Sequence, residues 1–227
     1  MKLDIEDPKE GIYVGDYVYD TIKKNIINFN IKPGNRISEK EISELLKVSR
    51  TPAREAFIKL SKEGLLYVLP QRGTYISYID LEEVEETRFI RESLEKSVIA
   101  LAVESFPEAL LQELEENLKI QRKYIKEKAY DKFLELDEAF HRMIFKGCNK
   151  ERAWLFMEQI NTQYKRVRLL SFIADVNWDK AIDQHGELIE AIREKNKEKA
   201  EDVITKHLKK LIVEQIELKQ RYPEYFK

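Results

Sequence analysis

The residues in this sequence best suited to chemistry are three histidines and one aspartate in its second half. His141, His185 and His207 are the only histidines of the chain, and each lies on the apolar stripe of a predicted helix. Asp137 precedes His141 by one helical turn, so both side chains leave that helix on the same face. Burying a carboxylate and three imidazoles without partners is costly. The set therefore favours convergence on one metal ion, held by ligands from facing helices.

The same four residues are open to other interpretations. One buried histidine alone is more often a hydrogen-bonded core residue than a ligand. A structural zinc site would need no small molecule, whereas a metalloenzyme would need a general base beside the metal. Glu95 and Glu138 are the candidate bases, but no enzyme motif accompanies them, so we expect no enzymatic activity. Zinc and nickel are the expected ions, and manganese is also possible for nitrogen and oxygen ligands.

A second set of residues is suited to nucleic acid. Arg50 and Arg54 lie four apart on a predicted helix, so both guanidiniums can enter a major groove and one can grip guanine bidentately. Ser49, Thr51 and the backbone N–H groups at the same helix start can hold phosphates. An isolated arginine pair more often only solvates a helix face. The DNA interpretation therefore depends on the elements that carry this pair.

The order of those elements is that of a DNA-reading domain. Helical spacing predicts three helices before residue 65, and the period then becomes strand-like over residues 67–69 and 74–78. The strands form a hairpin with Arg72 and Gly73 at its tip, a slim turn that suits an adjacent minor groove. Helix, helix, short turn, helix and hairpin make a winged helix-turn-helix, in which the third helix enters the major groove.

After residue 80 the sequence is nearly all helical. We predict helices near residues 81–104, 107–128, 130–147, 150–173, 178–195 and 197–220. The expected fold is mostly α, with a winged helix-turn-helix over residues 8–78 and an all-α antiparallel helical bundle over residues 79–222. The junction between them is short and not rich in Gly or Ser, so we expect coupled domains.

Charge and composition agree with this division. Residues 12–78 carry 11 Lys and Arg against 7 Asp and Glu, whereas residues 79–227 carry 27 against 31. A basic first third suits a partner rich in phosphates. The longest apolar run, Val98 to Val103, is far shorter than the roughly 20 residues of a membrane span, and no apolar signal segment opens the chain. We therefore expect a cytoplasmic protein without membrane contact.

The first domain resembles the GntR family of bacterial regulators. The resemblance lies in IKPGNRISEKEI at residues 31–42 and VSRTPAREA at residues 48–56, with Gly64-Leu65 at the family's helix end and Arg72-Gly73 at its wing. It implies that the residues contacting DNA are Lys40, Ser49, Arg50, Thr51, Arg54, Arg72 and Gly73. Lys40 stands where the best-known member of the family has an arginine.

The second domain, roughly Leu81 to Tyr222, resembles the metal-binding form of the FCD ligand domain of the FadR-type branch of that family. The resemblance rests on Asp-x-x-x-His followed by two later single histidines. It implies that the metal ligands are Asp137, His141, His185 and His207. It also implies a small carboxylate effector at the open coordination positions, paired bidentately with Arg91. An ion pair between Arg91 and Glu95 is the alternative, and Arg168 is a further effector candidate.

Together these features predict a sequence-specific transcription regulator, most simply a repressor. A homodimer would read a pseudo-palindromic operator in double-stranded DNA, because a two-fold protein requires a two-fold site. A small organic acid at the metal would modulate operator affinity by shifting the packing of the helical bundle.

Overall fold

The computed structural model describes residues 3–8, 10–174 and 178–227, with only the backbone described at residues 211–214. The chain divides into two compact units. The N-terminal unit comprises Met1–Leu81 together with Lys219–Lys227, and the helical unit comprises Glu82–Leu218. The domain limits expected from the sequence, 8–78 and 79–222, stay a prediction about which segments fold independently.

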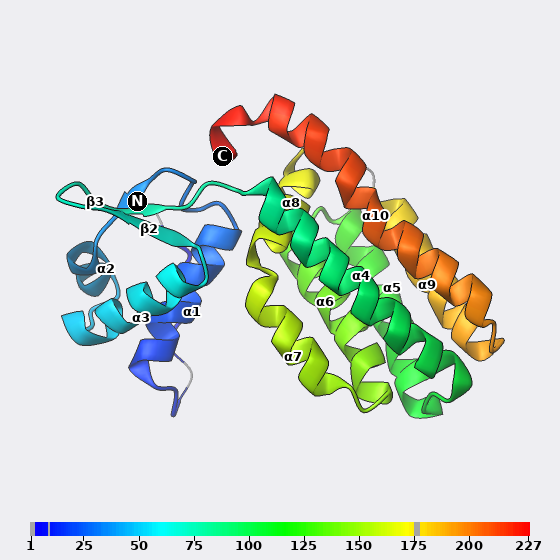
Figure 1. The fold of residues 1–227 in the computed structure, drawn as a ribbon. Helices are drawn as coiled ribbons and strands as arrows, with labels where there is room; N and C mark the ends of the chain where they lie inside the picture. Colours follow the sequence, from blue (N-terminus) through cyan, green and yellow to red (C-terminus); the bar gives the residue numbers. More distant parts are fainter. Residues whose placement is uncertain (1–2, 9, 175–177) are drawn as a thin grey trace. The chain divides into compact units, whose positions relative to one another are not determined.

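The N-terminal unit has the predicted winged helix-turn-helix architecture (Figure 1). Its helices are α1 (Val14–Ile27), α2 (Glu39–Leu45) and α3 (Arg50–Lys62), and its strands are β1 (Arg36–Ile37), β2 (Leu66–Leu69) and β3 (Gly73–Ile76). The strands pair antiparallel in the order β1-β3-β2. The sequence did not predict β1, because two residues are too few for an alternating pattern to appear.

Local signals determine where α2 and α3 begin and end. Ser38 caps α2, and its hydroxyl oxygen accepts from the backbone N–H of Glu41 at 3.2 Å. Pro52 lies in the first turn of α3, where the backbone N–H groups have no helical partner to lose. Gly64 follows the helix with φ +69°, a conformation that glycine adopts without strain. These residues fix where α3 begins and ends, so that it starts directly after the turn that follows α2.

Apolar residues at helical spacing fix α1 against α3. Val18, Ile22 and Ile26 lie one turn apart on α1 and are fully buried, as is Leu60 of α3. They belong to one apolar cluster that also takes in the inner face of the sheet through Ile76. Because this face of α3 is buried in the core, its opposite face and its start are left for a ligand.

The segment after α10 packs on the N-terminal unit. Ile79 donates its backbone N–H to the carbonyl of Tyr225 at 2.8 Å and accepts from Lys227 at 2.9 Å, which makes a parallel bridge with Phe226. The Tyr225 ring stacks on Phe29 with 5.2 Å between centroids, and Phe226 is buried. The domain limits predicted from the sequence end at residue 222 and do not include this segment.

We expect Phe226→Ala to loosen this attachment. Losing the buried ring should lower the local opening free energy by about 1–3 kcal/mol. The Ile79 amide reports this directly, because its hydrogen bond to Tyr225 exists only when the segment is attached. Amide hydrogen exchange at Ile79 should therefore accelerate by about 5- to 150-fold. Exposed Glu224 is the control, and equal exchange in Phe226→Ala and Glu224→Ala would contradict the packing role.

The helical unit is an all-α bundle (Figure 1). Its helices are α4 (Leu81–Glu104), α5 (Glu108–Lys126), α6 (Tyr130–Gly147), α7 (Glu151–Ile160), α8 (Thr162–Ile173), α9 (Asp179–Arg193) and α10 (Lys197–Arg221), the last reaching into the C-terminal segment. Helix α5 packs against both α6 and α9. None of the described helices combines the length and apolar character of a membrane span.

One segment predicted as a single helix forms two helices in the structure. The sequence predicts a single helix near residues 150–173, whereas in the structure the helix is interrupted at Asn161, between α7 and α8. The carbonyl of Ile160 accepts from the Thr87 hydroxyl at 3.1 Å, and the Asn161 amide contacts Glu138 at 3.3 Å. These contacts come from α4 and α6, so no periodicity within residues 150–173 reveals the break. It is this break that directs α8 into the bundle interior.

Candidate metal centre and DNA-binding surface

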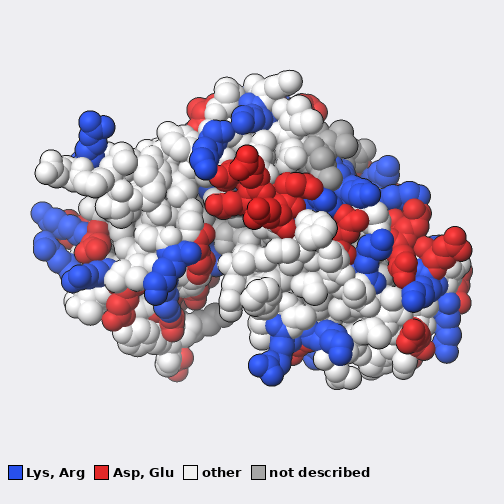
Figure 2. Space-filling model, viewed as in Figure 1, with Lys and Arg blue, Asp and Glu red and all other residues white. Residues whose placement is uncertain are grey.

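The start of α3 presents the side chains predicted to contact DNA. Arg50, Thr51 and Arg54 are exposed there, and Ser49 occupies the N-cap position with an extended backbone. In the described part of the chain Arg50 and Arg54 form no ion pair, so both guanidiniums are available to a ligand. Figure 2 shows Lys and Arg side chains gathered over α2 and the start of α3. The arrangement suits phosphates and base edges of a major groove.

A shallow hollow of about 300 Å³ lies between the starts of α2 and α3 and the strand β3. Three cations, Arg36, Lys40 and Arg50, and one anion, Glu39, line it together with Gly73 at the start of β3. Lys40 and Gly73 therefore border the same hollow as Arg50. Arg72 is exposed in the hairpin turn, immediately before Gly73.

Arg36 is a candidate DNA-contacting residue that the sequence analysis missed. It lies on β1, where pairing with β3 brings its Nε to 2.7 Å from the place that a Cβ on Gly73 would occupy. Gly73, with φ +117°, is the residue type that tolerates both this backbone conformation and this close approach. No local signal marks Arg36, because β1 joins the wing only through long-range pairing.

The helical unit brings together the four predicted metal ligands. Asp137 and His141 come from α6, His185 from α9 and His207 from α10, and one ligand atom from each lies within 4.8 Å of all the others. All four are buried, with exposures of 0, 1, 0 and 9%. The carboxylate of Asp137 is nearest to the imidazoles, with Oδ1 3.6 Å from His185 Nε2 and Oδ2 3.8 Å from His141 Nε2.

Each histidine also has an oxygen partner at its other ring nitrogen. Nδ1 of His141 lies 2.6 Å from Glu95 Oε2, Nδ1 of His185 lies 2.8 Å from Gln121 Oε1, and Nδ1 of His207 lies 3.3 Å from Gln184 Oε1. For His185 the direction is determined by a further bond, because the Gln121 amide nitrogen donates to Asn117 at 2.6 Å and its oxygen is thereby left to accept. Nδ1 then carries the proton and Nε2 presents its lone pair to the cluster.

Burial and neighbouring charges keep His185, His207 and Asp137 in the protonation states that a metal needs. It lowers the pKa of His185 to about 3 and that of His207 well below its usual value, so both are neutral at pH 7. Burial alone would raise the pKa of Asp137, but Arg168 and His141 outweigh it and hold that pKa below its usual range. Two neutral imidazoles and an ionised carboxylate are ready-made ligands.

We expect acid to destabilise the metal-free protein. The pKa of His185 is about 3 in the folded state and near 6.5 in the unfolded chain, so below pH 6.5 the unfolded state binds more protons. The contribution of this group to the free energy of unfolding is therefore fully present above pH 6.5 and is lost as the pH falls from 6.5 to 3. The loss is up to about 1.4 kcal/mol per pH unit for each such group. Urea unfolding with chelator present at pH 7, 6 and 5 measures this.

The control for this pH dependence is His185→Gln, which removes one titrating group and should make the slope shallower. A free energy of unfolding that stays constant from pH 7 to 5 in the original protein would contradict the burial of neutral imidazoles.

The donor set fits a divalent metal ion. Oδ1 of Asp137 and Nε2 of His141 and of His185 are buried without a hydrogen-bond partner among the described residues. Buried polar atoms without partners are costly, and their convergence indicates that a bound group completes them. Three imidazoles and one carboxylate are ligands that zinc, nickel and manganese accept. An ion held there would supply a positive centre for an anionic ligand.

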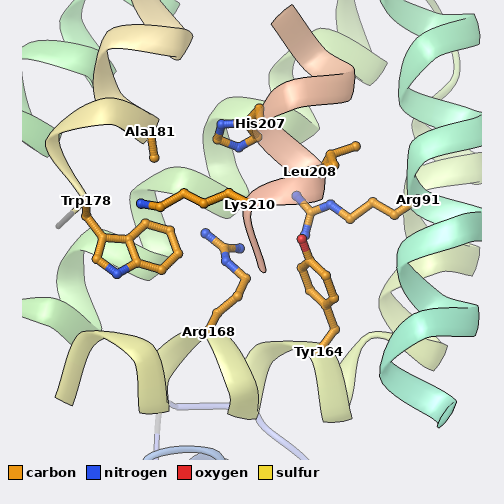
Figure 3. A pocket seen from close by; sticks show the side chains of 8 residues that line it. All are labelled: Arg91, Tyr164, Arg168, Trp178, Ala181, His207, Leu208 and Lys210. Atoms are coloured by element: carbon orange, nitrogen blue, oxygen red, sulfur yellow. The ribbon is translucent and has the colours of Figure 1, made fainter. Parts of the chain in front are cut away.

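The two predicted effector-binding arginines lie beside the cluster. Figure 3 shows Arg91 of α4 and Arg168 of α8 pointing toward a cavity lined also by His207, Tyr164 and Lys210, among others. The cavity measures about 10 Å³, room for about one water molecule. Arg91 pairs with Glu95 at 2.5 Å, as the alternative interpretation expected, and Arg168 pairs with Asp137 at 2.5 Å.

Comparison with known proteins identifies the family. Residues 15–76 match the bacterial regulatory proteins of the gntR family, and residues 86–210, more than half of the chain, match the FCD domain. The chain belongs to the FadR-type branch of the GntR family. The HTH-type transcriptional repressor RspR of Escherichia coli (strain K12) is 33% identical over 213 residues, which cover 94% of this chain and 93% of that protein.

Other matches of this GntR regulator agree. The gluconate operon transcriptional repressor of Bacillus licheniformis is 25% identical over 182 residues, which cover 78% of this chain and 74% of that protein. Among solved structures, that of E. coli McbR/YncC superposes with a TM-score of 0.77 at 24% identity, covering 93% of this chain and 99% of that one. This structural likeness supports the fold.

The family membership decides the broad function. The protein is a transcription regulator that binds DNA through its helix-turn-helix, and it is not an enzyme. The two residues considered as catalytic bases have other contacts. Glu95 holds His141 in place, and Glu138 binds both cavity arginines.

Proposed function

We propose that this GntR regulator is a repressor whose operator affinity is set by a metal-dependent sensor of a small organic acid. The observation that carries the proposal is the meeting of four ligand atoms within 4.8 Å, beside a cavity lined by Arg91 and Arg168. The ion would be zinc or nickel, or manganese. The sign of regulation is supported by two relatives whose names describe repressors.

The cavity favours an acid over a neutral ligand. Arg91, Arg168 and Lys210 line it, so three cations lie around a space bordered by the metal ligand His207 (Figure 3). Four protein ligands leave one or two positions open on a five- or six-coordinate ion. A carboxylate can bind the ion through one oxygen and a guanidinium through the other, and charge-assisted bonds of this kind are the strongest polar contacts available.

In a homodimer, the N-terminal units of the two subunits would together recognise the operator. We assign the contacts with the operator to Lys40, Ser49, Arg50, Thr51, Arg54, Arg72 and Gly73, with Arg36 added from the structure. Homodimerisation would use the helical unit, where Phe89 of α4 and Phe156 of α7 are 64% and 60% exposed. Aromatic side chains are enriched at protein interfaces relative to the rest of the surface, and a two-fold dimer would read a pseudo-palindromic operator.

A gel-shift series on the native promoter tests the sensing function. Metal-loaded protein, chelated protein and metal-loaded protein with a panel of small organic acids are compared at one salt concentration, because phosphate contacts depend strongly on salt. We expect chelation to change the operator affinity and at least one acid to weaken it. Unchanged affinity in every case would refute metal-linked sensing and leave the DNA-binding function standing.

Calorimetry separates sensing from a structural metal. Acids titrated into metal-loaded protein should give a binding signal that chelated protein lacks. If chelation lowers the melting temperature but no acid gives a signal, the ion is a structural staple and the effector proposal fails.

A further inference from the structure

Glu138 bridges both arginines of the cavity through a single oxygen. Its Oε1 lies 2.6 Å from Nη1 of Arg168 and 3.2 Å from Nη1 of Arg91. Its other oxygen, Oε2, accepts from the Asn161 amide at 3.3 Å and lies 3.6 Å from Nζ of Lys165. Glu138 is not one of the residues that line the cavity, but its carboxylate holds one N–H donor of each cavity arginine, a donor that an anionic ligand of these arginines would need.

The arginines have other carboxylate partners, but those partners serve the metal cluster. Arg91 pairs with Glu95, whose second oxygen contacts His141, and Arg168 pairs with Asp137. Among the described residues Glu138 contacts no histidine. Of the three carboxylates it is the one that can leave the arginines without disturbing a ligand or the partner of a ligand.

We propose that Glu138 is an internal competitor of the effector and sets the ligand selectivity of the site. This inference rests on the effector function proposed above. The carboxylate of the effector takes the Nη1 donors of Arg91 and Arg168, and Glu138 moves away toward Lys165 and Asn161. Both carboxylates cannot stay on the same two donors, because like charges at that separation repel strongly.

The arrangement around Glu138 makes this exchange a selective one. A neutral ligand cannot replace the charge-assisted bonds that Glu138 makes with the two guanidiniums, whereas a carboxylate restores them. The departing Glu138 also finds a cation, since Lys165 already lies near its Oε2 and is held by Glu158 at 2.8 Å. Exchange would thus alter the contacts between α6 and the start of α8, the part of the bundle created by the break at Asn161.

Isothermal titration of zinc-loaded, full-length protein tests the competition. Acetate and succinate are the probes, and succinamide is the neutral analogue of succinate. We expect Glu138→Gln to bind the acids roughly tenfold more tightly than the original protein, because a neutral amide competes weakly for the guanidiniums. Succinamide should bind neither protein. Glu92→Gln is the matched control, since Glu92 is 18% and Glu138 15% exposed, and within the described part of the chain Glu92 pairs only with Arg88.

Three outcomes decide the matter. Equal or weaker acid binding in Glu138→Gln, or an equal gain in Glu92→Gln, overturns the competition while leaving the effector function intact. If neither acid binds to either protein, the effector function fails as well. If Glu138→Gln does not fold, crystals of the original protein with zinc and succinate replace it, and Glu138 still bridging both arginines beside bound succinate overturns the proposal.

Discussion

Arg50→Ala is expected to abolish most of the affinity for operator DNA. Arg50 is exposed at the start of α3 and lines the basic hollow with Arg36 and Lys40. A bidentate contact with a guanine contributes about 1–3 kcal/mol of discrimination, and a dimer would lose it twice, for a total of about 2–6 kcal/mol. Fluorescence anisotropy with the native promoter at fixed salt measures the loss, which should be largest for the preferred sequence.

Two lysines provide the controls for Arg50. Lys62 is exposed at the other end of α3, and Lys24 on α1 already pairs with Asp4 at 3.1 Å. Lys62→Ala and Lys24→Ala each remove one positive charge from the same unit but should retain nearly all operator affinity. An equal loss in Arg50→Ala and Lys62→Ala would show that only net charge matters, and the assignment of α3 as the reading helix would be wrong.

The second large effect is expected when the metal cluster is disabled. A metal that binds only the folded state adds about 4 kcal/mol when its free concentration is a thousand times its Kd. For a chain of this size that corresponds to a rise in melting temperature of about 8–16 °C. His185→Ala removes a fully buried residue proposed as a ligand, so the increase in melting temperature on adding zinc or nickel should nearly vanish. Thermal denaturation with and without metal measures it.

Phe140→Leu separates ligand loss from packing loss. The Phe140 ring stacks on His185 with 4.2 Å between centroids and is fully buried, but it carries no ligand atom. The variant should have a lower melting temperature than the original protein. Adding metal should still raise its melting temperature by the full amount. If His185→Ala gained as much from metal as Phe140→Leu does, His185 would not be a ligand.

The DNA-reading half of the protein could be predicted closely from its sequence because its signals are local. The cap at Ser38, Pro52 in the first turn of α3 and Gly64 after it are read within a few residues of the elements they bound. What was missed there, β1 and with it Arg36, depends on pairing with β3 far along the chain. A two-residue strand has no periodicity of its own.

The metal cluster could be predicted only in part. Helical spacing put Asp137 and His141 on one face and each histidine on an apolar stripe, which predicted burial. The oxygen partners could not be foreseen. Gln184 precedes His185 in the chain but contacts His207, and Glu95, expected to pair with Arg91, also contacts His141.

Residue types, spacing and caps thus determined which helices form, which faces are buried and which side chains are suited to metal or DNA, since these depend on neighbours within one or two turns. Only the tertiary structure decided which buried groups meet. The break at Asn161, the bridging position of Glu138 and the packing of Phe226 against Ile79 all follow from contacts between distant segments. Such contacts form because buried polar groups need partners, and packing chooses the partners from anywhere in the chain.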